Sequence, residues 1–149
     1  MIAMRKREHM KEPYADINPT KQIPYMQEVD SNTGEVFNLG ESHTILRYLA
    51  DSRGCPDHWY PNDLRERAKV DAYLDQHHTY LRLGVGGYIF RKLFSKTLLG
   101  ITYEEKDLEF FKIMLKRSLR LIETRLTEHK YLCSDQVSIA DLSAACELD

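Results

Sequence analysis

Cysteine is scarce in this sequence, and the few cysteines present lie far apart. The 149 residues contain three of them, Cys55, Cys133 and Cys146, and no CxxC pair. An odd and widely spaced set supplies neither a disulfide framework nor the paired ligands of a structural zinc site. Free cysteine is among the most buried residue types, so we expect three reduced thiols buried in the fold.

The sequence also lacks an excess of either charge and any long apolar run. Lys and Arg number 21 against 23 Asp and Glu, a net charge of -2, which gives no electrostatic reason to expect nucleic acid as a partner. No segment approaches the ~18 apolar residues of a membrane span. The opening MIAMRKREHMKEPY has no apolar signal-peptide core. We therefore expect a cytoplasmic protein without a membrane or nucleic-acid partner.

Familiar catalytic and cofactor motifs are absent too. No Ser-His-Asp or Cys-His arrangement can be read, and GVGG (84–87) lacks both the GxGxxG spacing and a preceding strand. His77 and His78 are adjacent, so on a helix their side chains diverge by about 100° and cannot chelate one metal ion together. We expect no metal site and no bound cofactor.

The first third of the chain has the pattern of a β-hairpin followed by a helix. YMQEV (25–29) and EVFNL (35–39) are β-rich runs, and the turn formers DSNTG (30–34) between them predict a hairpin with a longer loop. From Ser42, SHTILRYLADSRG spaces its apolar residues for one helical face and ends at Gly54.

The remainder is predicted to be helical. CPDHWYPND contains two prolines and no periodicity, which indicates a linker over 55–62. Asp63 is placed to cap the helix that follows. GVGG (84–87) interrupts or kinks the helical pattern, and YIFRKLF (88–94) resumes it.

Two capping boxes mark later helix starts. Thr102 with Glu105 forms a T-x-x-E box ahead of a long helix, and Ser138 with Asp141 forms a second box near the C-terminus. The long helix should pack antiparallel against the helix after Asp63, because each carries an apolar stripe that needs cover. The stripe of the long helix consists of Leu108, Phe111, Leu115, Leu119, Ile122 and Leu126.

The hairpin and its helix combine groups that suit the charged ends of an amino acid. Pro24 stands where the first strand starts and can be cis, and the peptide before it is then available to an added extended chain. The helix start offers free N–H groups to a carboxylate; Ser42 adds a hydroxyl, and Glu41 can accept from an ammonium. From the residues alone, Ser42 as an ordinary N-cap is the commoner arrangement.

Four stretches resemble the theta class of the glutathione transferases: NPTKQIP, ESHTILRYLA, PDHWYPNDLRERAKVDAYL and SIADL. They occur in that family's order and at close to its spacing, and the resemblance runs from about Glu8 to Asp149. It implies a mostly α chain with a small α/β part. The β-hairpin plus helix of a thioredoxin-like domain would occupy 1–54, the linker 55–62, and an all-helical glutathione-transferase C-terminal domain 63–149.

The resemblance also implies a glutathione site at the hairpin end. Ile23, before cis-Pro24, would hydrogen-bond the cysteinyl backbone of glutathione. Glu41 and Ser42 would take the γ-glutamyl amine and carboxylate.

Three further residues have implied roles outside that group. His9 sits where theta enzymes have a histidine near the glycyl carboxylate of glutathione. Gln22 stands where many members have Lys, so it would supply a hydrogen bond without a charge. Arg82 is similar to an arginine that faces the electrophile pocket.

The implied function is conjugation of glutathione, a co-substrate, to small electrophiles by a homodimer, an activity used in detoxification. In the family, the serine that stabilises the glutathione thiolate lies on a β-α-β unit ahead of all these motifs. We therefore expect a fragment with no catalytic residue of its own and negligible conjugation. The alternative is a naturally shortened, non-catalytic module that holds peptides or protein partners through the helical unit.

Overall fold

The protein, seen as a computed structural model, divides into two compact units. Residues 2–3 and 6–149 are described, and the units are Met1–Gly54 and Cys55–Asp149. Residues 55–62, predicted to be a linker, lie in the second unit and contain the short 3-10 helix η3 (Asp57–Trp59).

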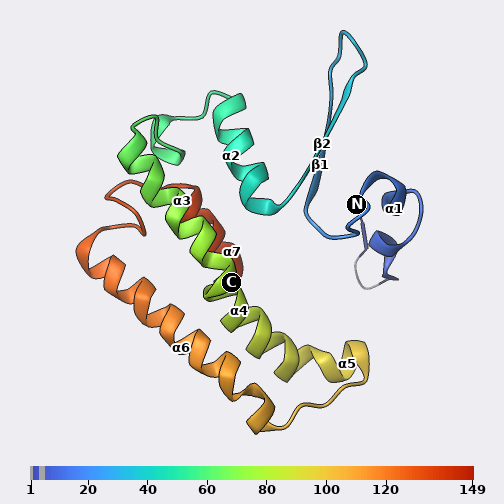
Figure 1. Cartoon of the computed structure of the whole chain (residues 1–149), viewed down its shortest axis with the longest axis vertical. Coiled ribbons are helices and arrows are strands. Elements are labelled where there is room, and N and C mark those ends of the chain that lie inside the picture. Colours follow the sequence, from blue (N-terminus) through green and yellow to red (C-terminus); the bar gives the residue numbers. More distant parts are fainter. Residues whose placement is uncertain (1, 4–5) are drawn as a thin grey trace. The chain divides into compact units, whose positions relative to one another are not determined.

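The first unit is built around an antiparallel hairpin of β1 (Tyr25–Val29) and β2 (Val36–Gly40) (Figure 1). The predicted first strand is confirmed, and the second is shifted by one residue. The short helices η2 (Glu8–Met10) and α1 (Tyr14–Ile17) precede the hairpin. Helix α2 (Ser42–Ser52) follows it and packs on both strands.

The hairpin loop is organised by Asp30. Its carboxylate accepts hydrogen bonds from the backbone N–H groups of Asn32, at 2.7 Å, and Thr33, at 2.9 Å. These bonds favour the ionised form and lower the pKa of the Asp30 carboxyl. Gly34 closes the loop with a φ of 73°, in the left-handed region that glycine adopts without a steric penalty.

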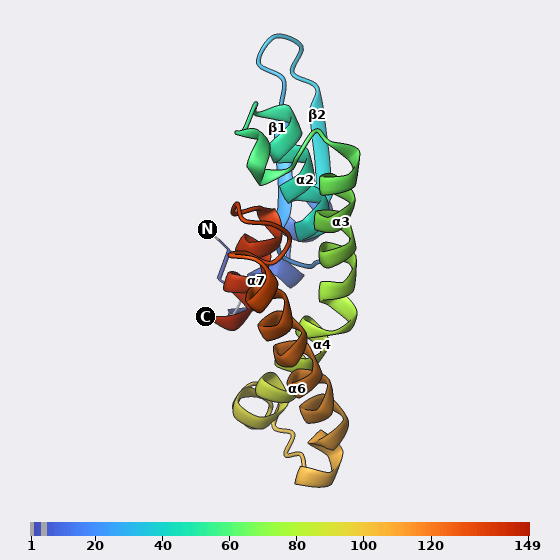
Figure 2. The same ribbon diagram turned by 90° about the vertical axis from the view of Figure 1, so that its left-hand side faces the viewer.

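The second unit is helical. Figures 1 and 2 show α7 alongside α3, and α4 packs against α6. The prediction that Asp63 caps α3 is confirmed, because its carboxylate accepts from the backbone N–H groups of Arg65 and Glu66, both at 3.0 Å. The elements after η3 are α3 (Leu64–Thr79), α4 (Leu81–Val85), the π-helical η4 (Gly86–Phe94), α5 (Ser95–Leu99), α6 (Glu105–Glu128) and α7 (Ile139–Leu148).

Two of the three glycines of GVGG are explained by close helix packing. A Cβ atom on Gly84 would lie 2.6 Å from the Leu115 Cα, and one on Gly87 would lie 2.2 Å from the Phe111 ring. The helical path continues past these residues, but it changes from α to π geometry at Gly86. The motif thus lets α4 and η4 approach α6.

One predicted capping box is confirmed and the other is wrong. Ser138 and Asp141 form the reciprocal box at the start of α7. At α6 the box consists of Glu104 and Asp107. Thr102 lies in the irregular segment ahead of the helix, because the chain enters the helix two residues later than the T-x-x-E spacing indicates.

The apolar core belongs to the helical unit. Among the described residues, every buried hydrophobic side chain lies between Val70 and Ala144. The predicted α6 stripe is only partly buried, since Leu119 and Leu126 are exposed. The expectation of three buried thiols was also wrong: Cys133 is buried, whereas Cys55 and Cys146 are exposed, and all three are free.

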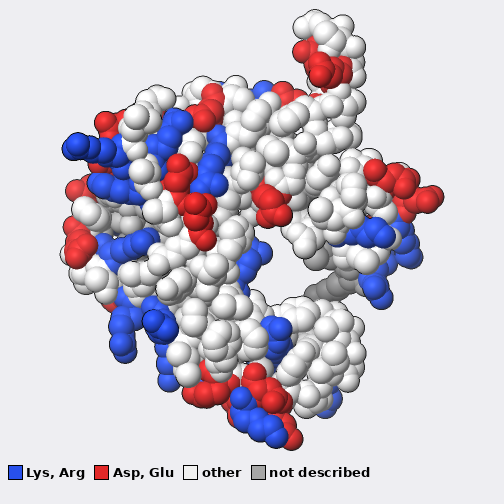
Figure 3. Space-filling model, in the orientation of Figure 1, with Lys and Arg blue, Asp and Glu red and all other residues white. Residues whose placement is uncertain are grey.

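Charge is spread without a dominant sign. Figure 3 shows Lys and Arg side chains intermingled with Asp and Glu on the face in view, in keeping with the net charge of -2. Within 2–3 and 6–149, no helix is both long and apolar enough to cross a membrane. The same residues contain no cluster of three or more His, Cys, Asp and Glu that could hold a metal ion.

Candidate functional site

The hairpin register places two predicted site segments at one end of the ladder. Tyr25 pairs with Gly40 as the terminal pair. The next residues outward are Pro24 on one strand and Glu41 on the other, with Ile23 and Ser42 beyond them. Directly opposite residues of an antiparallel pair have Cα atoms about 4.5–5.5 Å apart. The four residues therefore gather where the strands end and α2 begins.

The segment before β1 presents its backbone at the surface. The Ile23-Pro24 peptide is cis, as the resemblance implies. Both residues are exposed, and the Ile23 N–H and C=O make no hydrogen bond to another described residue. A shallow cavity of about 280 Å³ lies here, and Ile2, Tyr14, Ile23, Pro24 and Tyr25 line it.

The start of α2 differs from the ordinary cap that the residues alone favour. Glu41 is the N-cap residue, Ser42 is the first helical residue, and neither side chain forms a capping bond. The first intrahelical bond runs from the Ile45 N–H to the Glu41 carbonyl, at 2.9 Å. The N–H groups of Ser42 and Thr44 precede it, so the helix end and the Ser42 hydroxyl can donate to an anion.

Glu41 itself has an unusual backbone. Its φ is 66° and its ψ is 112°, a positive φ that costs a residue with a side chain of the order of 1–3 kcal/mol. Its side chain is exposed. A strained residue next to an uncapped helix start is typical of a binding site, where the surrounding structure holds the strain.

The remaining predicted residues are placed less directly. Gln22 precedes Ile23, and its side chain is exposed. His9 lies on η2, and its Nδ1 atom is buried with no hydrogen-bond partner among the described residues. The role of His9 near the glycyl carboxylate of glutathione stays a prediction.

Asn18 and Tyr14 support the site, and the sequence interpretation missed both roles. Asn18 is fully buried, and its amide Nδ2 donates to the Gln22 carbonyl at 2.7 Å and to the Tyr14 hydroxyl at 3.1 Å. Its Oδ1 accepts from the backbone N–H of Thr20 at 3.1 Å and from its hydroxyl at 2.7 Å. Asn18 thereby fixes the loop that leads into Ile23. The Asn-Pro dipeptide was the available signal, because Asn commonly bonds the backbone two residues on.

Arg82 belongs to the helical unit. It lies on α4 with its side chain 53% exposed, and its guanidinium pairs with the Glu147 carboxylate at 2.8 Å. The same carboxylate oxygen is 3.5 Å from Nε2 of His77. The role of Arg82 in an electrophile pocket stays a prediction.

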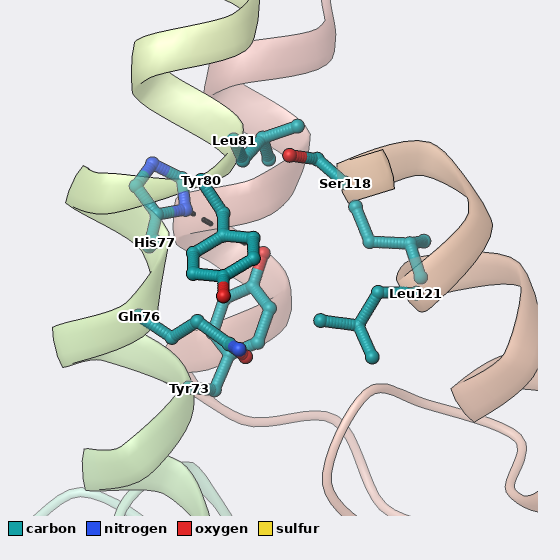
Figure 4. A pocket seen from close by; sticks show the side chains of 8 residues that line it. Tyr73, Gln76, His77, Tyr80, Leu81, Ser118 and Leu121 are labelled. Atoms are coloured by element: carbon teal, nitrogen blue, oxygen red, sulfur yellow. Dashed lines mark hydrogen bonds between the residues drawn. The ribbon is translucent and has the colours of Figure 1, made fainter. Parts of the chain in front are cut away.

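His77 is a core residue of α3. It is 1% exposed, and burial, with smaller contributions from Arg82 and His78, lowers its pKa to about 4. Figure 4 shows it beside a narrow pocket between α3 and α6, which Tyr73, Gln76, Ser118 and Leu121 also line. The cavity volume is about 10 Å³, enough for roughly one water molecule. This pocket is too small for an organic substrate.

Comparison with known proteins establishes the family. Residues 73–149 match the family model described as glutathione S-transferase, C-terminal domain. The chain belongs to the glutathione S-transferase family.

The similarity to named relatives points to the theta class. The chain is 40% identical to glutathione S-transferase T1 of Arabidopsis thaliana over 99% of its own length and 59% of that protein's. It is 34% identical to the apo form of human glutathione-S-transferase T1-1, with a TM-score of 0.85, over 99% of its own length and 59% of that chain. The predicted fold class, a thioredoxin-like part followed by a helical domain, is confirmed. The chain spans about three fifths of the length of these relatives.

A third similar structure carries a ligand. It is a human theta-class glutathione transferase in complex with the glutathione conjugate of 1-menaphthyl sulfate. It is 31% identical to this chain, with a TM-score of 0.84, over 99% of this chain and 58% of that one.

Proposed function

We propose that residues 1–54 bind glutathione and that the chain is a theta-like member of the glutathione transferases, enzymes that conjugate glutathione to electrophilic small molecules, with negligible conjugation by these 149 residues on their own. The observation that carries the proposal is the hairpin register, which brings Ile23-Pro24 and Glu41-Ser42 to one end of the ladder. The similar human theta-class structure with a bound glutathione conjugate supports it.

Each part of the proposed site matches one part of glutathione. The unpaired backbone of Ile23 binds the cysteinyl backbone as an added strand would. The N-terminus of α2 and the Ser42 hydroxyl bind the γ-glutamyl carboxylate, and Glu41 binds its ammonium. His9 and Gln22 contribute polar contacts toward the glycyl end.

The proposed contacts hold glutathione without activating it. Conjugation needs the glutathione thiolate, which an enzyme supplies by lowering the pKa of the thiol. We assign that task to none of the residues above, since all of them contact the backbone or the ends of the ligand. The 149-residue chain should therefore bind glutathione and turn over electrophiles negligibly.

A titration of the chain with glutathione, followed by calorimetry and by amide NMR shifts, tests the site. Ser42→Ala should weaken binding about tenfold, the usual effect of losing a hydrogen bond to a charged group. Glu41→Gly should weaken it at least as much. The glycine should also raise the folding stability by about 1 kcal/mol, because it adopts the positive φ without strain.

The matched control is Ser52→Ala at the opposite end of α2, which should leave the affinity unchanged. If Ser42→Ala, Glu41→Gly and Ser52→Ala all bind glutathione as tightly as the wild type, the ligand binds elsewhere. Absence of binding by the wild type would refute the site.

The alternative function is a non-catalytic module that binds protein partners. Exposed apolar side chains on η4 and α5 favour it, namely Phe90, Leu93, Phe94, Leu98 and Leu99. We propose that the protein is cytoplasmic and forms a homodimer, with which the same surface is compatible. Light scattering at increasing concentration tests the dimer. Failure to bind glutathione, together with a stable complex with another protein, would favour the alternative.

A further inference from the structure

A cavity in the helical unit lies outside every residue assigned above. It has a volume of about 270 Å³ and opens between α3, the end of α6 and the segment that follows α6. This is close to the lower limit of roughly 300 Å³ for small-molecule pockets. Its lining residues are Lys69, Ala72, Arg125, Glu128, His129, Leu132 and Cys133.

The lining is richer in cationic than in anionic side chains. Lys69 and Arg125 are the cations of the lining, against one lining carboxylate, that of Glu128. The His129 ring lies 4.0 Å from the Asp135 carboxylate. Lys69 is neutralised in part by Glu66, at 2.8 Å. The cavity therefore offers an electrostatic preference for an anion, and Arg125 is the group on which that preference depends.

Arg125 is partly buried and has only neutral partners. Its guanidinium donates to the Gln76 side-chain carbonyl at 3.1 Å and lies 5.3 Å from the centre of the Tyr73 ring. No carboxylate of residues 2–3 and 6–149 comes within 4.0 Å of it. A guanidinium has five N–H donors, so most of them are available to a ligand. Partial removal of a cation from water without a counter-ion is unfavourable, and an anionic ligand would relieve that cost.

The rest of the wall is neutral or apolar. The Cys133 thiol donates to the Lys69 carbonyl, with 3.6 Å between sulfur and oxygen. Burial raises the pKa of this thiol to about 11, so it contributes no negative charge. Ala72 and Leu132 add apolar surface.

We propose that this cavity binds a small organic carboxylate, with the Arg125 guanidinium as its ion-pair donor. The planar fork of Arg matches a carboxylate with two parallel hydrogen bonds. Ala72 and Leu132 then contact the apolar part of the ligand, which an inorganic anion lacks. This proposal is independent of the glutathione site, because all of its residues lie in the helical unit.

Titration of the full chain with benzoate, followed by amide NMR shifts, tests the proposal. We expect saturable shifts at the backbone amides of Ala72, Leu132 and Cys133, and none with benzamide, the neutral analogue. Arg125→Gln should weaken benzoate binding at least tenfold, whereas Arg125→Lys should keep part of it. Arg120→Gln, an exposed position on the same helix, is the matched control and should change nothing.

A second variant keeps the test decisive if Arg125→Gln disturbs folding. Ala72→Phe narrows the cavity from an exposed position on α3 and leaves Arg125 in place, so it should also abolish the benzoate shifts. Equal binding of benzoate and benzamide would overturn the proposal. Benzoate shifts that survive both Arg125→Gln and Ala72→Phe would overturn it as well.

Discussion

The two units of this chain are stabilised in different ways. In the helical unit, α3, α4, α6 and α7 bury apolar side chains such as Leu74 and Ile139. In the hairpin unit, the buried side chains are polar, Asn18 and His43, while Val29, Val36 and Phe37 on the strands are exposed. The helical unit rests on apolar packing, and the hairpin unit rests on local polar contacts.

The contacts that join the hairpin to α2 illustrate the second kind. Glu28 of β1 accepts a hydrogen bond from the Tyr48 hydroxyl at 3.0 Å and pairs with Arg53 at 2.9 Å. Phe37 and Tyr48 add one aromatic contact, with ring centres 5.2 Å apart. Partly exposed contacts of this type contribute modestly, and a two-stranded hairpin is marginal in water. Substitutions should therefore cost most in the helical core and least on the strands.

The largest effect is expected from Leu74→Ala. Leu74 is 0% exposed on α3, and removal of a buried leucine side chain leaves a cavity that costs about 2–5 kcal/mol. Urea unfolding followed by the fluorescence of Trp59, the single tryptophan, measures the loss in the unit that contains it. The control is the same substitution at Leu64, which is 80% exposed on the same helix and should change the free energy of unfolding by less than about 0.5 kcal/mol. Similar losses at both positions would contradict the assignment of the core.

His77 should make the stability of the helical unit depend on pH. Its folded pKa of about 4 lies below the unperturbed value of about 6.5, so between these values the unfolded chain binds a proton that the folded chain does not. Stability is complete above pH 6.5, falls as the pH is lowered to about 4, and levels off below. At about 1.4 kcal/mol per pKa unit the loss is about 3–4 kcal/mol.

Glu147 lies 3.5 Å from the ring nitrogen, and the pKa of His77 is lowered with this carboxylate in place. His77→Gln should remove the pH dependence over this range, whereas His129→Gln, at an exposed position, should preserve it. A slope that is unchanged in His77→Gln would assign the effect to another group.

Local patterns predicted most elements of the fold, because their determinants lie within a few residues. The Asp63 cap, the Ser138 box and the first strand are of this kind. The error at Thr102 has the same origin: the Thr102–Glu105 and Glu104–Asp107 boxes overlap in the sequence, and the helix starts with the second. The sequence indicated an interruption or kink at GVGG, but it had no signal for the π geometry after Gly86.

The candidate site was predictable in its residue types and less so in its conformation. The two strands and their turn already indicate that Pro24 and Glu41 share one end of the hairpin. The positive φ of Glu41 had no signal, because residues other than glycine adopt it only where the surrounding structure imposes it. The sequence marked Asn18 only as part of an Asn-Pro turn, so the hydrogen bonds of its buried side chain could not be predicted.

Gly84→Ala should destabilise the helical unit through overpacking. The added methyl would lie 2.6 Å from the backbone of Leu115, which cannot rotate away, so α4 and α6 must separate at a cost of about 1–3 kcal/mol. Gly86→Ala is the control on the same stretch, since its nearest neighbour, a Glu147 side-chain oxygen, is 4.0 Å away. The control should be neutral or slightly stabilising, because alanine favours helical backbone. If both variants unfold at the same urea concentration, the close contact of α4 with α6 is wrong.

Val36→Ala should have the smallest effect on stability. It tests the expectation that substitutions on the hairpin strands cost less than substitutions in the helical core. Val36 pairs with Val29 at the loop end of the ladder, and their side chains are 49% and 56% exposed. Truncation removes little buried area, so we expect a loss below about 0.5 kcal/mol, seen as slightly faster hydrogen exchange of the β1 and β2 amides. The Trp59 unfolding transition should stay unchanged, because it reports on the helical unit. A loss above about 1 kcal/mol in the Trp59 transition would show that the two units share stabilising contacts through this strand pair, and the contrast between them would then fail.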